Sequence, residues 1–212
     1  MKPPLQRRGQ KQSNGPVGGN VVQGLLLIAR GRAEGVEAFA GTPDGFLSAL
    51  SPWLAFLLVG VLLMVLREPS AIGGTLFLLS FCALLLPPVL SHLFAARWER
   101  GPLWLRYATA AVWCEWLVIF AYVASLVVVM VLLQLGVPPN LASAVLMGVV
   151  VCYWLWLHWF LAWRGLALTG VRAAVLVGSI IAATAVLCGV AQVLPPHVGM
   201  FAVPHDSAAT TE

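Results

Sequence analysis

The chain of 212 residues has a composition that excludes a water-soluble globular domain. Hydrophobic residues make up 60% of it and charged residues only 9%, against roughly 25% charged residues in soluble domains. The mean hydropathy is +0.92, and apolar runs of about 20 residues, the length that spans a bilayer, recur along the chain. The net charge of +4 comes with no dense basic face on a water-facing domain, which excludes nucleic-acid binding. An all-α polytopic membrane protein is predicted.

The N-terminal residues differ from the apolar runs that follow, because they carry most of the early charge. Residues 1–19 hold four basic residues and no apolar stretch, so we expect a disordered basic cytoplasmic tail and no cleavable signal. Such a tail is attracted to anionic lipid headgroups by about 1 kcal/mol for each Lys or Arg near the surface. Residues 20–41 mix aliphatic and charged side chains and predict one amphipathic lead-in helix in the membrane interface.

Residues 42–194 are predicted to form a transmembrane domain of five helices, and residues 195–212 a disordered C-terminal tail. The first helix has clear start signals, with Thr42 as its N-cap and Pro43 in its first turn. The predicted spans are residues 45–66, 71–94, 107–135, 141–163 and 172–193.

Prolines mark two special places in this domain. Pro87 and Pro88 fall inside the second apolar run, so that span should be kinked, either as a fixed bend or as a hinge. Gly136 is followed by two further prolines, a pattern that predicts a tight turn between the third and fourth spans.

The basic residues predict how the five spans are oriented. With the N-terminus in the cytoplasm, 11 basic residues fall on the inside and only Arg67 on the outside. Cytoplasmic segments of membrane proteins carry the excess of Lys and Arg, so we predict an N-in, C-out protein of the inner (plasma) membrane. The inside residues are Lys2, Arg7, Arg8, Lys11, Arg30, Arg32, Arg97, Arg100, Arg106, Arg164 and Arg172.

In this orientation all nine tryptophans fall in the cytoplasmic half of the membrane or near its midplane. An aromatic belt at one interface explains the asymmetry, because indole rings prefer headgroup depth. An aromatic-lined cavity open to the cytoplasm is the alternative. The tryptophans are Trp53, Trp98, Trp104, Trp113, Trp116, Trp154, Trp156, Trp159 and Trp163.

Three titratable side chains, Glu115, His158 and His92, form a candidate intramembrane polar cluster. An ionisable group inside a bilayer is costly unless it is paired or hydrated, so each is a candidate functional residue. Glu115 has no basic residue one turn away on its own helix and must be protonated or find a partner on another span. His158 lies at a similar depth and is the predicted hydrogen-bond partner, with His92 nearer the surface. An interhelical clasp and a proton-relay or ligand-binding site both fit this cluster.

No metal site, cofactor site or catalytic residue is predicted. The three polar residues have no HxxxH or HExxH spacing that would place two metal ligands on one helix. No nucleophile–base motif or glycine-rich phosphate loop is present, and the loops are too short to hold a water-soluble active site. We therefore expect a protein without enzymatic activity.

Small residues recur at three- and four-residue steps in the last two spans, a pattern that lets helix backbones approach closely. They predict helix-packing faces, with a homo-oligomer interface as the alternative. The residues are Ala144, Gly148, Gly178, Ala182, Ala185 and Gly189.

The stretch LLLIARGRAEGVEAFAGTPDGFLSALSPWLAFLLVGVLLMVL resembles bacterial members of the Yip family of small integral membrane proteins. The resemblance covers residues 21–193, with the amphipathic lead-in and five closely spaced spans, and the polar N-terminus that precedes them is also similar in character. Eukaryotic Yip proteins act in vesicle trafficking and associate with small GTPases and with one another, whereas most bacterial members have no assigned function. We expect a scaffold, or an assembly or trafficking partner, that binds another membrane protein or its own copies, because the loops are short, small residues line two helix faces and the connector at residues 95–106 is basic and aromatic. A small proton-coupled permease or ligand-binding membrane protein that uses Glu115 and His158 is the alternative.

Overall fold

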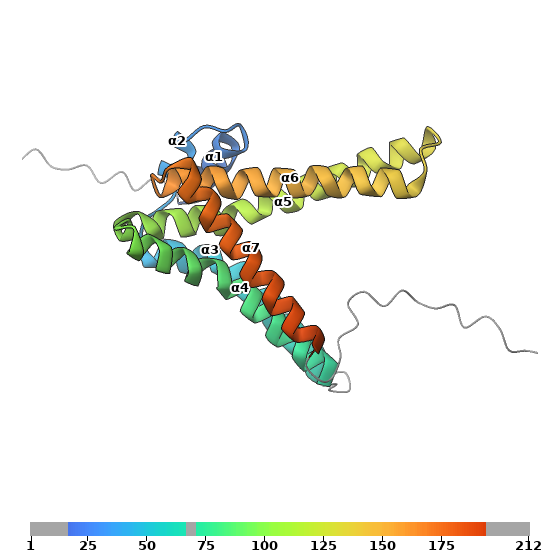
Figure 1. Cartoon of the computed structure of the whole chain (residues 1–212), viewed down its shortest axis with the longest axis horizontal. Helices are drawn as coiled ribbons and strands as arrows, with labels where there is room; N and C mark the ends of the chain where they lie inside the picture. Colours follow the sequence, from blue (N-terminus) through green and yellow to red (C-terminus); the bar gives the residue numbers. More distant parts are fainter. Residues whose placement is uncertain (1–16, 67–70, 194–212) are drawn as a thin grey trace, which may run out of the picture.

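The computed structural model describes residues 17–66 and 71–193, and within these ranges the chain forms helices and turns without a strand (Figure 1). Five of the helices, α3 to α7, are long and apolar enough to cross a membrane, so the predicted all-α class and the number of spans are confirmed. The predictions for residues 1–16 and 194–212 lie outside the described residues. The helices are α1 (Val17–Ala29), α2 (Glu34–Glu37), α3 (Pro43–Leu66), α4 (Ala71–Arg97), α5 (Gly101–Gln134), α6 (Pro139–Gly165) and α7 (Gly170–Val193).

The lead-in segment differs from the single helix predicted for residues 20–41. It consists of two helices, α1 and α2, separated by a turn in which Gly31 has a φ of 73°. Glycine adopts this left-handed conformation without steric cost, so the chain can reverse there. The two helices then pack closely, because a Cβ added to Gly35 would lie 2.6 Å from the carbonyl oxygen of Gly24.

The ends of the long helices follow local sequence signals. The N-cap predicted for α3 is confirmed, since the backbone N–H of Gly45 donates to Oγ1 of Thr42 at 3.2 Å and the helix begins at Pro43. The third span begins at Gly101, earlier than the predicted residue 107. Pro102 stands in its first turn, where a missing N–H costs nothing, so the helix can start before the apolar run. The predicted tight turn joins α5 to α6, and Gly136 has a φ of 84° there.

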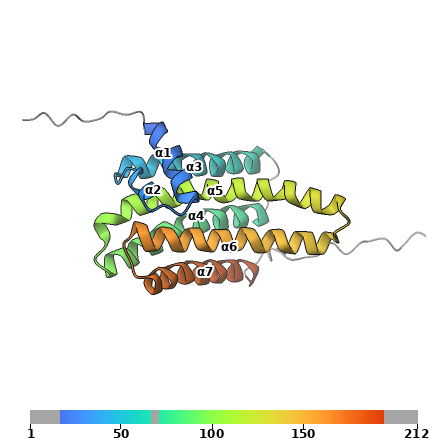
Figure 2. The ribbon, with the colours of Figure 1, turned by 90° about the horizontal axis from the view of Figure 1, so that it is seen from above.

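The spanning helices converge at one end of the molecule and diverge toward the other. In Figure 1 the α5–α6 hairpin runs to the right, while α3, α4 and α7 run toward the lower right. The α4–α5 and α6–α7 connections lie at the end where the two groups meet, and α1 and α2 lie at this end too (Figures 1 and 2). We call it the convergent end.

The hydrophobic core lies at the convergent end. Its members come from the beginning of α5, the end of α6 and the beginning of α7, with further contributions from α1, α2 and α4. Among them Ile28, Leu157, Leu161 and Leu176 are fully buried. The remaining lengths of the spans expose aliphatic side chains, as expected for surfaces that a bilayer solvates. The buried packing between helices is therefore concentrated at the convergent end.

The small residues of α6 and α7 do not pack helices together within the described chain. The prediction that they form helix-packing faces inside the bundle is therefore wrong. All six are exposed, and a Cβ added to Gly148, Gly178 or Gly189 would meet no atom within 4 Å. The structure turns these faces outward because the core forms from other sides of the same helices. The homo-oligomer interface stays a prediction for Ala144, Gly148, Gly178, Ala182, Ala185 and Gly189.

Candidate functional site

A cavity of about 230 Å³ lies where the spans begin to diverge, and all five contribute to its wall. Most of the wall is aliphatic or aromatic, with polar side chains at a few positions. This combination is typical of small-molecule sites in proteins. The lining residues are Trp53, Ala83, Leu84, Pro87, Pro88, Ser91, Tyr107, Ala108, Ala111, Val112, Glu115, His158 and Ile180.

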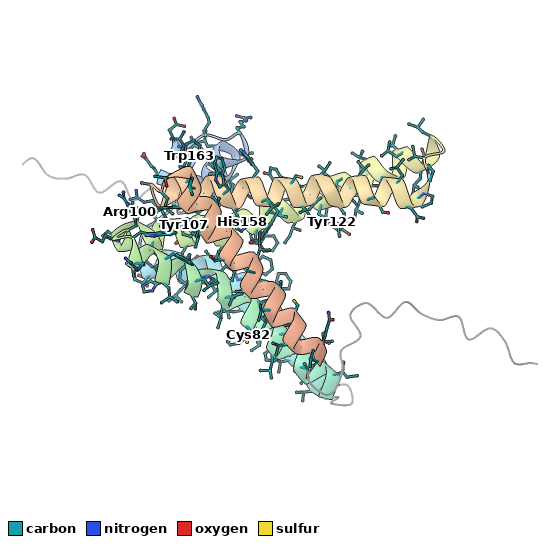
Figure 3. All side chains as sticks on the ribbon, viewed as in Figure 1. Cys82, Arg100, Tyr107, Tyr122, His158 and Trp163 are labelled. Atoms are coloured by element: carbon teal, nitrogen blue, oxygen red, sulfur yellow. The ribbon has the colours of Figure 1, made fainter. Side chains whose placement is uncertain are left out.

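Glu115 and His158 meet at this wall, as the sequence predicted, and we call them the polar pair. Nε2 of His158, on α6, lies 3.0 Å from Oε1 of Glu115, on α5. The His158 side chain is only 7% exposed, whereas that of Glu115 is 34% exposed. Figure 3 shows His158 and Tyr107 close to the vertex of the two diverging groups. The carboxyl group therefore borders the cavity, and the imidazole behind it is enclosed by protein.

The geometry of the polar pair fixes where its protons can be. Nδ1 of His158 lies 3.0 Å from the carbonyl oxygen of Trp154, which only accepts hydrogen bonds, so Nδ1 carries a proton. A hydrogen bond between Nε2 and the carboxylate oxygen then needs one further proton between them. It resides either on Glu115, as a carboxylic acid, or on His158, as an imidazolium. In both arrangements the polar pair is electrically neutral and holds one exchangeable proton.

Pro87 and Pro88 change the backbone chemistry of the cavity wall contributed by α4. The helix runs through both prolines, which have no N–H to donate to the carbonyl groups four residues earlier. Those carbonyls belong to Ala83 and Leu84, which also line the cavity. Two backbone acceptors of lining residues on α4 thus lack their usual partners. Whether the prolines form a fixed bend or a hinge stays a prediction.

The indole groups around the cavity differ in how well their N–H groups are satisfied. Nε1 of Trp104 donates to Oγ of Ser91 at 3.1 Å. Nε1 of Trp53 and Nε1 of Trp116 are buried without a hydrogen-bond partner among the described residues. These two rings pack against each other with centroids 5.7 Å apart. The sequence indicated Trp53 only as one of nine tryptophans and gave no sign of Ser91, because no local pattern distinguishes the residues of a span that face a cavity.

His92 does not join the polar pair. Its side chain is exposed, it is absent from the cavity wall, and its ring lies edge-on against Trp104 at a centroid distance of 4.7 Å. The predicted cluster of three is therefore reduced to Glu115 and His158. Within residues 17–66 and 71–193 no group of three His, Cys, Asp or Glu side chains is placed to hold a metal ion.

Aromatic and basic side chains also meet at the convergent end, away from the cavity. The guanidinium carbon of Arg164 lies 3.9 Å from the ring centroid of Trp163, and that of Arg172 lies 5.9 Å from that of Trp98. Nε1 of Trp159 donates to the carbonyl oxygen of Gly170 at 3.0 Å and closes the α6–α7 connection. Trp53 lines the cavity, in agreement with the cavity explanation for that residue, whereas the aromatic belt stays a prediction for the other tryptophans.

No protein-family model, curated protein or solved structure gives a significant match to the chain. The fold and the site therefore define its class on their own. It is an integral membrane protein of the polytopic α-helical class, with a cavity at the junction of its spans and a hydrogen-bonded carboxyl–imidazole pair on the cavity wall.

Proposed function

We propose that this protein is a non-enzymatic, proton-linked binding protein or carrier of the membrane, and that the cavity is its ligand site. The observation that carries the proposal is the polar pair, a neutral Glu115–His158 unit that borders a cavity formed by all five spans. An ionisable pair inside a membrane protein marks a substrate, ion or proton pathway by default. Losing its proton would leave a carboxylate facing the lone pair of Nε2, which removes the attraction between α5 and α6 at this point.

The orientation that we propose places the convergent end in the cytoplasm. It is supported by the described arginines, which gather on the segments that meet at that end of the molecule, as the positive-inside rule requires. The cavity then lies toward the inner side of the membrane. These arginines are Arg30, Arg32, Arg97, Arg100, Arg106, Arg164 and Arg172.

Nitrogen NMR of histidine-labelled protein in lipid nanodiscs tests the proton store directly. We expect Nδ1 of His158 to stay protonated across the titration, because it is tied to the Trp154 carbonyl, while Nε2 changes with pH. A Glu115→Gln variant keeps the size of the side chain and removes its charge, so the response of Nε2 to pH should differ from that of the unaltered protein. Glu34→Gln, at an exposed position in α2, is the matched control. Ring nitrogens of His158 that do not respond to pH in the unaltered protein would refute the proposal.

A scaffold or assembly role is the second candidate, and it is favoured by the outward small-residue faces of α6 and α7. Gly178 and Gly189 present open backbone on a lipid-facing side of α7, where a helix of another chain can approach closely. The partner would be a membrane protein or a second copy of this chain, in line with the resemblance to the Yip family. Cross-linking from a cysteine introduced at Gly189 distinguishes the scaffold role from the carrier role. It captures a specific neighbouring protein only if that protein covers this face of α7.

A further inference from the structure

We infer that the cavity binds a primary ammonium ion attached to an apolar group, and that it releases one proton from the polar pair when it does so. The inference rests on the proposed function, since it names the ligand of the same site. It follows from three properties of the cavity wall: the sign of its charge, the supply of hydrogen-bond acceptors and the apolar character of the remainder.

The charge of the site is negative once the exchangeable proton has left. Glu115 is the acidic side chain among the lining residues, and the wall contains no Lys or Arg. A carboxylate beside a mostly apolar wall attracts a cation more strongly than it would in bulk water, because the local dielectric constant is lower. An anionic ligand would meet the same carboxylate without any compensating charge. The cavity therefore selects positive ligands.

Several hydrogen-bond acceptors gather around the polar pair, beside one donor on the same wall that has no partner among the described residues, Nε1 of Trp53. Oε2 of Glu115 has no hydrogen-bond partner among the described residues, since only Oε1 contacts His158. After proton loss Nε2 of His158 is also an acceptor, because the proton on Nδ1 is committed to Trp154. The carbonyls of Ala83 and Leu84 lack the amide donors that a helix without proline would supply. A primary ammonium group brings three N–H donors and suits this set.

The rest of the wall accommodates an uncharged apolar body. Aromatic faces from Trp53 and Tyr107 and small aliphatic side chains such as Ala108 and Ala111 line it. Aromatic rings also stabilise a nearby cation through their negative faces. The volume of about 230 Å³ limits the ligand to a small molecule, such as an arylalkyl or short alkyl amine.

Charge and protons balance in the exchange. Before binding, the polar pair holds one proton and is neutral. The ammonium ion enters with one positive charge, and the proton that lay between Glu115 and His158 leaves to water. The site then contains a carboxylate, a neutral imidazole and the ammonium ion, so its net charge stays zero. Binding is therefore linked to the release of one proton, and its apparent affinity increases by up to about tenfold per pH unit while the pair still holds that proton.

The other titratable groups near the polar pair do not supply this proton. Tyr107, on the cavity wall, and Cys114, next to Glu115, are buried on α5. The lining residues from α3, α4 and α7 are a tryptophan, aliphatic residues, prolines and a serine, none of which titrates near neutral pH. A proton released around pH 7 on ligand binding would thus come from the polar pair.

Calorimetric titration of the whole protein in nanodiscs tests the inference with three probes that share one apolar group. Benzylamine, protonated at neutral pH, carries a charge and N–H donors; benzyltrimethylammonium carries the charge alone; benzyl alcohol carries neither a charge nor N–H groups. Repeating the titration in buffers of different ionisation enthalpy counts the protons released. We expect affinities in the order benzylamine, benzyltrimethylammonium, benzyl alcohol, with one proton released per benzylamine bound.

Variants complete the test. Glu115→Gln should weaken benzylamine binding by at least about tenfold and abolish proton release, because the charged partner of the cation is gone. Glu34→Gln should leave both unchanged. Benzyl alcohol that binds as tightly as benzylamine, or benzylamine bound without proton release by the unaltered protein, would overturn the inference. Either calorimetric result overturns the ligand class alone if His158 responds to pH in the NMR experiment, because the proton-linked function is then still supported.

Discussion

A double-mutant cycle on Glu115 and His158 measures how strongly the polar pair holds α5 and α6 together. Replacing either residue by leucine removes one partner and leaves the other in the membrane interior without it. Replacing Glu115 is the more costly of the two changes, because the His158 side chain that is left without a partner is only 7% exposed and cannot reach water. The double replacement removes both polar groups, so no buried group remains unsatisfied.

The expected magnitudes follow from the contact and its burial. Leaving a buried acceptor or donor unsatisfied costs about 1–3 kcal/mol, so Glu115→Leu and His158→Leu should each lower the free energy of unfolding by that amount. Hydrogen bonds between membrane helices contribute about 0.6 kcal/mol on average and up to about 1.7 kcal/mol. With a contact of 3.0 Å, the pair should lie in the upper half of that range. The double variant should therefore lose less than the sum of the two single losses by about 1–1.7 kcal/mol.

The assay is reversible unfolding in detergent mixtures, followed by circular dichroism of the helices. The matched control combines His158→Leu with Glu34→Leu, two positions on different elements whose side chains have no interaction in the structure. This control cycle should be additive within about 0.5 kcal/mol. Additivity of the same quality for Glu115 and His158 would refute the reasoning, because it would mean that the contact has no energetic value.

Two further predictions concern backbone approach and buried indoles. Gly35→Ala should destabilise the lead-in helices by about 1–3 kcal/mol, because the new Cβ would lie 2.6 Å from the carbonyl oxygen of Gly24. Gly178→Ala places its Cβ in open space and should instead stabilise its helix by about 0.5–1 kcal/mol. Hydrogen exchange measures the first effect and unfolding the second, and equal losses of stability for the two variants would contradict the structure. Trp53→Phe should lower the free energy of unfolding by about 1 kcal/mol less than Trp104→Phe, since only Trp104 gives up a hydrogen bond. The reverse order in the unfolding assay would show that the N–H of Trp53 has a partner.

Local chemistry allowed several features to be predicted from the chain alone. The apolar runs identify five spans because a helix must cover the hydrocarbon thickness with apolar side chains. Thr42 and Pro43 mark the start of α3 because they satisfy or avoid unpaired N–H groups at a helix end. His158 could be named as the candidate partner of Glu115 for a similar reason, since a carboxyl group in a membrane needs a partner and few were available at its depth.

Other features depend on how the helices are placed relative to one another. The reversal at Gly31 was missed because the amphipathic pattern continues across it, and only the close approach of Gly35 to Gly24 requires two helices there. The small-residue faces of α6 and α7 were assigned to the bundle, yet the structure turns them outward. A pattern of small residues along one span shows which face is suited to close packing, but it does not show whether another helix or lipid contacts that face.

The sequence by itself determined the membrane class, the five spans and the asymmetry of basic residues, because each follows from the composition of single helices. It named His158 as a candidate partner of Glu115 from their similar depth, but only the tertiary structure decided that the two side chains face each other. Only the tertiary structure decided that the spans converge at one end, that Trp53, Pro87 and Pro88 share a cavity with the polar pair, and that His92 lies apart from it. The physical reason is that a cavity is a property of rotation and crossing between helices, and in an apolar span many rotations satisfy the bilayer equally well.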